Sequence, residues 1–272
     1  HFGWLNWPDI HGYSLGIWAV VVVNFIVTNA MLTLTITYLL GKLADSLDST
    51  LASRQATVLG LAKLAEYRDN ETGAHLLRMR QYSKMLAAQR LQADNPPAEL
   101  NDDFIQDISL SAILHDIGKV GIADAILLKP GKLTPQEFEQ IKAHPVIGGQ
   151  VLRSLLEYAP QCTFIQMGQD IASGHHEKWD GSGYPLGLKG EDIPLSARIV
   201  ALVDVYDALT SPRCYKRPFS HQEAIDLMIE GKGKHFDPEL VDCFMAIHQE
   251  FEVLSKASLD DAYQPMAQPT MV

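Results

Sequence analysis

The chain begins with a long run of apolar residues. No charged side chain lies between Asp9 and Lys42, and the stretch between them reaches the length of about 20 apolar residues that crosses a bilayer. We therefore predict a transmembrane helix over residues 16–41. The alternative is a buried core helix, because Asn24, Asn29 and several threonines make the run only moderately hydrophobic.

The charges that flank this run predict its orientation. Lys42 and Arg54 follow it, whereas no lysine or arginine precedes it. Basic residues gather on the cytoplasmic side of a membrane. We therefore expect the C-terminal portion in the cytoplasm, at the inner membrane, and residues 1–15 as an extracytoplasmic or upstream remnant. Position 1 is not methionine, so the chain is expected to be processed or part of a longer protein.

A heptad pattern of apolar residues follows the run and predicts a helical linker over residues 42–64. Such a stalk would pair with a second copy and make a homodimer. The alternative is an ordinary amphipathic helix that lies on its own domain, because the pattern is short and an arginine interrupts it. The a and d positions are Ala44, Leu47, Leu51, Arg54, Val58, Leu61 and Ala65.

The remainder of the chain reads as one helix after another. Capping boxes begin at Thr134 and Ser220, and a third helix start stands at Asp237. Signals for β-strands are weak, so we predict one all-α domain over residues 65–254. Inside it we expect a long glycine- and proline-rich loop over residues 176–194, and after it a frayed tail over 255–272.

Composition excludes some functions. The 272 residues are 47% hydrophobic and carry a formal net charge of −11, so the chain can bury a core but should repel nucleic-acid polymers. Cys162, Cys214 and Cys243 are scattered without a CxxC spacing, which gives no disulfide or structural zinc framework.

Histidines and acidic residues stand where the apolar pattern predicts burial. His115 and Asp116 directly follow Ile113 and Leu114, and burying an imidazole with a carboxylate is costly unless something compensates. Taken singly, each such residue could be a satisfied core group or part of a solvated helix face. Together they indicate convergence on metal ions, and the set is Glu71, His75, His115, Asp116, His144, His175, His176 and Asp204.

The ligand types restrict the chemistry. Glu71 and His75 stand four residues apart, which places both on one helix face. Imidazoles and carboxylates without thiolates suit iron, manganese or catalytic zinc rather than a closed structural zinc site. The set exceeds what one ion takes, so we expect two or three ions, an arrangement that favours phosphoester hydrolysis.

Several nearby residues could contact a phosphate or a base. Lys119 stands one turn after His115, and Arg213 and Lys216 follow the segment that holds Asp204. Each could equally be an exposed basic residue. In the long loop, Trp179 and Tyr184 could stack on a base, although aromatic residues in such loops more often pin the loop to the core.

Three motifs in this order resemble the HD-GYP domain family. They are "HDIGK" at 115–119, "ADAILLKPGKLTPQEFEQIKAHPVIGG" at 123–149 and "HHEKWDGSGYP" at 175–185, and the resemblance covers roughly residues 65–252. The family implies an HD-type helical bundle that hydrolyses cyclic di-GMP to pGpG, to GMP or to both, in bacterial signalling.

The resemblance also implies roles for individual residues. Metal ligands would be His115, Asp116, His144, His175, His176 and Asp204, completed by Glu71 and His75, and that glutamate is typical of members with three metals. Asp116 and Lys119 would be catalytic, and Asp207 would play a supporting role. Substrate contacts would come from Lys119, Tyr184, Arg213 and Lys216.

The sequence departs from the family pattern at one visible place. Cys214 stands where many relatives have proline, which bears on the path of the chain from Arg213 to Lys216. No expected ligand is missing. We expect a membrane-anchored enzyme with a di- or trinuclear centre, of iron first and manganese as the alternative. Rival hypotheses are an HD hydrolase of another cyclic dinucleotide or nucleotide, and a non-catalytic module that binds cyclic di-GMP.

Overall fold

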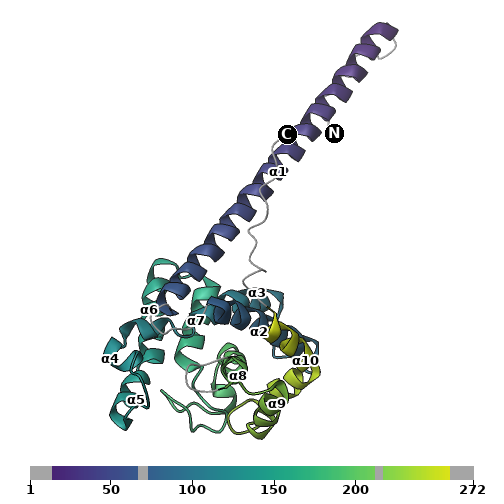
Figure 1. Ribbon diagram of the computed structural model, residues 1–272. Helices are drawn as coiled ribbons and strands as arrows, with labels where there is room; N and C mark the ends of the chain where they lie inside the picture. The colour runs from purple at the N-terminus through teal and green to yellow at the C-terminus, as the bar shows by residue number, and fades with distance from the viewer. Residues whose placement is uncertain (1–13, 67–72, 212–216, 258–272) are drawn as a thin grey trace, which may run out of the picture. The chain divides into compact units, whose positions relative to one another are not determined.

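Helices dominate the described chain, which confirms the predicted all-α fold. The computed structural model describes residues 14–66, 73–211 and 217–257 (Figure 1). Its regular structure consists of α-helices and short 3-10 turns, with an isolated β-bridge between Lys232 and Phe236. The chain divides into two compact units, residues 1–56 and 57–272.

Helix α1, Leu15–Glu66, carries the apolar run. In the first unit its apolar side chains are exposed, and the helix is long and apolar enough to cross a membrane by length and composition. The Asn24 amide donates to the carbonyl of Val20 at 3.0 Å, and the Asn29 amide donates to that of Phe25 at 2.8 Å. Each bond pairs one amide N–H within the helix, which lowers the cost of placing these polar side chains in an apolar environment.

The second unit begins with the last turns of α1. Two of the predicted heptad positions, Val58 and Ala65, are buried there, and the first belongs to the core of this unit. Farther upstream, Leu47 and Leu51 are exposed. The end of α1 therefore packs on its own domain, as the alternative of an amphipathic helix expected. The turns upstream of Val58 keep heptad positions that could contact a second copy.

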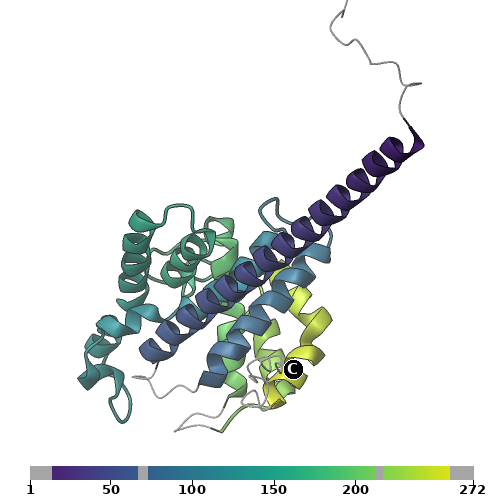
Figure 2. The same ribbon diagram turned by 90° about the horizontal axis from the view of Figure 1, so that it is seen from above.

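The second unit continues as a helical bundle. Figures 1 and 2 place α4, α5 and α6 on one side of it and α9 and α10 on the other. After α1, the elements are α2 Gly73–Gln92, α3 Asp102–Ser111, η3 Ala112–Leu114, η4 Ile117–Gly121, α4 Asp124–Leu127, α5 Pro135–Ile141, α6 His144–Tyr158, α7 Thr163–Gly174, η5 Gly190–Asp192, α8 Leu195–Thr210, α9 His221–Glu230 and α10 Pro238–Lys256.

Helix α8 lies at the centre of this bundle. It is buried over most of its length, as expected for a helix that is apolar on nearly every face, and α2, α7 and α10 pack against it. Tyr82 of α2 stacks on Phe251 of α10 with ring centroids 4.3 Å apart, and both rings contact Tyr206 of α8. This packing fixes α8, which carries Asp204, relative to α2, which carries His75.

The predicted helix starts are confirmed. Thr134 and Ser220 each form a capping box with the glutamate three residues later, at the starts of α5 and α9. The Asp237 side chain accepts a hydrogen bond from the backbone N–H of Glu239 at the start of α10. Each cap satisfies backbone donors that a helix start leaves unpaired.

Around His115 the chain forms 3-10 turns rather than a continuous α-helix. Helix α3 ends at Ser111, and two 3-10 turns follow, with His115 and Asp116 between them. In the second turn, Gly118 lies so close to α6 that an added Cβ would be 2.0 Å from the carbonyl oxygen of His144. The close approach brings the His115–Asp116 turn against the start of α6.

The substitution Gly118→Ala tests this close approach. The new methyl group would collide with backbone atoms of α6, so we expect a loss of about 1–3 kcal/mol in the free energy of unfolding. Urea denaturation of the detergent-purified chain, followed by circular dichroism, measures this change. The matched control is Gly60→Ala in α1, where an added Cβ meets nothing within 4 Å. An unchanged unfolding midpoint for Gly118→Ala would contradict the packing described.

Candidate metal centre

The fold gathers the predicted ligands into two adjoining groups. The Asp116 group contains Asp116, His144, His175 and His176, and the Asp204 group contains His75, His115 and Asp204. Within each group, the ligand atoms lie within 4.8 Å of one another. Three further predicted site residues, Glu71, Arg213 and Lys216, lie outside the described residues, as does Cys214.

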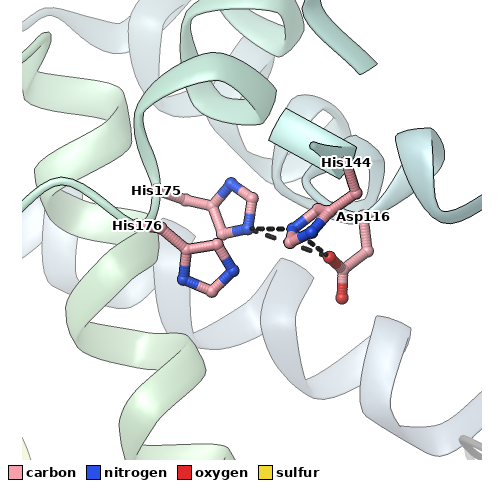
Figure 3. Close-up of side chains that lie close together, drawn as sticks. All are labelled: Asp116, His144, His175 and His176. Atoms are coloured by element: carbon pink, nitrogen blue, oxygen red, sulfur yellow. Dashed lines mark hydrogen bonds and ion pairs between the residues drawn. The ribbon is translucent and has the colours of Figure 1, made fainter. Parts of the chain in front are cut away.

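Most ligands of the Asp116 group stand at helix ends. His144 is the first residue of α6, and His175 directly follows the last residue of α7. Figure 3 shows their imidazoles and that of His176 directed towards one another and towards the Asp116 carboxylate. Because α6 and α7 pack closely along their lengths, the helix ends hold these side chains together.

The Asp116 carboxylate lies between the two groups. Its Oδ1 is 3.2 Å from Nε2 of His144 and 3.8 Å from Nε2 of His175. Its Oδ2 is 3.2 Å from Nε2 of His115, which belongs to the Asp204 group, and 2.8 Å from Nζ of Lys119. Asp116 can therefore reach a cation in either group, as a bridging ligand does.

Four imidazoles are oriented in the same way. In each, Nδ1 faces an acceptor behind the ring and Nε2 faces the cluster, which is the arrangement that prepares histidine for a metal. The Nδ1 contacts are His75 with Asp207 Oδ2 at 2.8 Å, His115 with Ala112 O at 2.9 Å, His144 with Ile141 O at 2.7 Å and His175 with Ile171 O at 3.0 Å.

Asp207 lies behind His75 rather than in either group. Its buried carboxylate accepts hydrogen bonds from Nε and Nη2 of Arg78, at 2.5 and 2.9 Å. Burial raises the pKa of Asp207, but Arg78 and His75 outweigh it and hold that pKa below its ordinary value. Sequence reasoning missed Arg78, although its place three residues after His75 on one helix face was a usable signal.

Burial and charge set the protonation of the imidazoles. Burial holds the pKa of His175 well below its ordinary value and lowers the pKa of His176 to about 3, so both rings are neutral and can donate a lone pair. Burial opposes a charge on His115 too, but the neighbouring Asp116 carboxylate outweighs it and raises the pKa of His115 to about 10. A proton on His115 thus balances the carboxylate charge when no metal does.

Sequence reasoning also missed Glu66, an acidic residue near His75. Glu66 ends α1 with its side chain buried, and its Oε1 lies 3.8 Å from Nε2 of His75. Its only sequence signal was an acidic residue next to alanine and leucine positions of an amphipathic helix. The carboxylate adds negative charge beside the Asp204 group.

The long loop covers one side of the cluster. The ring of Tyr184 stacks on His176, with centroids 4.7 Å apart and planes 26° from parallel. Burial raises the pKa of Tyr184 to about 12, which keeps the phenol neutral. Trp179 lies elsewhere: its backbone N–H donates to His235 O at 3.1 Å, and its ring lies under the Arg198 guanidinium. Trp179 therefore pins the loop to the bundle.

The donor set fits a centre of two or more divalent cations. Neutral imidazole nitrogens and carboxylate oxygens face one another, and Nε2 atoms of His144 and His175 lie only 3.4 Å apart. Two ligands of one ion, each bound at about 2.0–2.2 Å, lie at such a separation. The residues placed to hold cations are those of the two groups, with Asp116 between them.

Comparison with known proteins identifies related sequences over both units of the chain. A protein-family model described as HD domain matches residues 60–240, and one described as MASE11 matches residues 1–43. A probable cyclic di-GMP phosphodiesterase of Vibrio cholerae is 50% identical over 76% of this chain and 47% of its own length.

Two further relatives come from the same organism. A cyclic di-GMP phosphodiesterase is 46% identical over 82% of this chain and 46% of its own length. A 3'3'-cGAMP-specific phosphodiesterase is 42% identical over 75% of this chain and 36% of its own length. The chain thus spans about half the length, or less, of these relatives. With the HD domain model matched over most of its second unit, the chain belongs to the HD domain family.

Proposed function

We propose that this chain is a metal-dependent HD-GYP phosphodiesterase that hydrolyses cyclic di-GMP. The observation that carries the proposal is the mostly buried Asp116 carboxylate, which lies between two groups of inward-facing imidazoles and next to Lys119. The identity to cyclic di-GMP phosphodiesterases over three quarters of the chain supports the choice of substrate.

The two groups would hold a di- or trinuclear centre of iron or, alternatively, manganese, with Glu71 as a further ligand. Bound ions would act as Lewis acids on a phosphodiester and lower the pKa of water. The chain's own part is to hold Asp116 ionised, which it does against burial through Lys119 and His115. We assign Asp116 and Lys119 as the catalytic residues.

Lys119 is placed to act on charge. Its Nζ lies 2.8 Å from Asp116 Oδ2, and its side chain is mostly buried. In such surroundings a fixed cation stabilises developing negative charge more strongly than it does in water. Tyr184 offers a flat surface for a base next to His176. Arg213 and Lys216 remain predicted substrate contacts, as basic residues that would hold the phosphates.

A second candidate substrate is 3'3'-cGAMP. The observation in its favour is the 42% identity to a phosphodiesterase specific for that dinucleotide. Both substrates present two phosphodiesters and at least one guanine, so the metal ligands alone do not separate them. Turnover of cyclic di-GMP and 3'3'-cGAMP by the same anaerobically purified protein, with identification of pGpG, GMP or other products, separates the two proposals.

The proposal includes the membrane location and the oligomeric state of the protein. We place α1 across the inner membrane, with the second unit in the cytoplasm. The length and apolar composition of α1 and the basic residues that follow the run support this placement. We further propose a homodimer through the upstream heptad positions, because Leu47 and Leu51 are exposed on α1.

The substitution Asp116→Ala removes the shared carboxylate. We expect it to lower bound metal in both groups and to reduce cyclic di-GMP hydrolysis more than about 100-fold, because Asp116 would offer one carboxylate oxygen to each group. Elemental analysis and product chromatography measure the two effects. The control is Asp226→Ala, an exposed carboxylate on α9. A fully active, metal-replete Asp116→Ala protein would refute the assignment.

The substitution Lys119→Met separates charge stabilisation from metal binding. We expect kcat to fall about 100- to 1,000-fold, the usual effect of removing one group that stabilises transition-state charge. Bound metal should stay near the wild-type level, because the imidazoles and carboxylates of the two groups remain. Steady-state kinetics and elemental analysis test both statements. A variant that keeps its kcat would show that Lys119 has no catalytic role.

The protonation of His115 makes metal binding depend on pH. In the metal-free protein, the pKa of His115 is raised to about 10, so the ring carries a proton at neutral pH. A metal must displace that proton, so Mn²⁺ affinity should fall about tenfold per pH unit as pH is lowered. Calorimetric titrations of metal-free protein in buffers of different ionisation enthalpy measure the proton release. An affinity that does not change with pH would contradict this expectation.

A further inference from the structure

The loop that carries Tyr184 is closed by a buried carboxylate. Glu177 directly follows the ligand histidines His175 and His176 in the sequence and is about 1% exposed. A buried carboxylate without partners is costly. Glu177 has two: its Oε1 accepts a hydrogen bond from the backbone N–H of Leu186 at 2.7 Å, and its Oε2 accepts one from that of Leu188 at 3.0 Å.

These two bonds join the beginning of the loop to its far end. Hydrogen bonds to an ionised acceptor are stronger than those between neutral groups. Between the bonded ends lies the tip of the loop, where an added Cβ on Gly183 would be 2.3 Å from the backbone nitrogen of Lys178. The tip is therefore folded tightly against the backbone of Glu177 and its neighbour.

The fold of the tip places Tyr184 against the cluster. The backbone N–H of Tyr184 donates to His176 O at 3.2 Å, and the ring stacks on the His176 imidazole. The residues just after Glu177 are attached separately. The backbone N–H groups of Trp179 and Asp180 donate to the carbonyls of His235 and Lys234, which precede α10. Glu177 thus holds the segment that contains Tyr184, through its bonds to Leu186 and Leu188.

We infer that Glu177 is a positioning residue, which clamps the backbone amides of Leu186 and Leu188 so that Tyr184 stays stacked beside the metal ligands as a platform for a nucleotide base. The inference rests on the proposed function, and it assigns to Glu177 no contact with substrate or metal. Its carboxylate is required because it offers an acceptor to each amide, which a neutral isostere cannot do.

The substitution Glu177→Gln tests the clamp. Glutamine has one acceptor oxygen, and its NH₂ group would face a backbone N–H, donor against donor. We expect KM for cyclic di-GMP to rise about tenfold, with kcat within about threefold of wild type and bound metal unchanged. The control is Glu191→Gln, an exposed glutamate in η5 whose loss should change neither constant.

A double-mutant cycle shows whether Glu177 acts through Tyr184. We expect the KM of Glu177→Gln/Tyr184→Leu to equal that of Tyr184→Leu alone within about twofold, because the clamp is useless without the ring. Gly183→Ala displaces the same tip from the other side and should reproduce the rise in KM. An unchanged KM in Glu177→Gln, or effects of the two substitutions that simply multiply, would overturn the inference.

Hydrogen exchange tests the clamp without substrate. In Glu177→Gln, the amides of Leu186 and Leu188 should exchange about tenfold faster than in wild type, while the control Glu191→Gln leaves them unchanged. Exchange at the wild-type rate would overturn the inference even if the enzyme is active. If wild-type protein cleaves no cyclic dinucleotide, the proposed function fails, and the exchange of these amides still decides whether Glu177 holds the loop.

Discussion

The second unit depends on the compensation of one buried negative charge. The Asp116 side chain is mostly buried beside the imidazoles of His115 and His144, where an isolated carboxylate would be destabilised. Lys119, 2.8 Å away, and a protonated His115 compensate this charge in the metal-free protein. Divalent cations bound by the surrounding imidazoles and carboxylates would compensate it in the same way. The buried carboxylate of Asp207 is likewise paired with a cationic side chain, Arg78.

Close backbone packing brings the compensating groups together. Gly118 approaches α6 where no side chain fits, and Gly149 of α6 faces Ser173 of α7 so closely that an added Cβ would be 2.2 Å from its Oγ. These contacts align the start of α6 with the end of α7, so that His144 and His175 face each other. Backbone carbonyls behind the rings then fix the orientation of each imidazole.

Much of this arrangement could be predicted from sequence. The helix starts at Thr134 and Ser220 follow from local capping chemistry, which needs no knowledge of distant residues. The convergence of histidines from separate helices followed from the cost of burying them singly. The sequence could not supply what depends on tertiary geometry. Glu66 and Glu177 are acidic residues without local peculiarity, and only the path of α1 and of the loop shows what they face. The burial of Val58 likewise depends on the domain against which α1 packs.

The position of Asp116 has a consequence for how a centre of this kind fills. A cation in one group would draw on the same carboxylate as a cation in the other, because the two oxygens of Asp116 face His144 in one group and His115 in the other. Occupancy of the two groups would therefore be energetically linked, and such a linkage is reciprocal by thermodynamic necessity. Filling one group would then change the affinity of the other for a cation, so the metal content of the protein would differ from that of two independent sites.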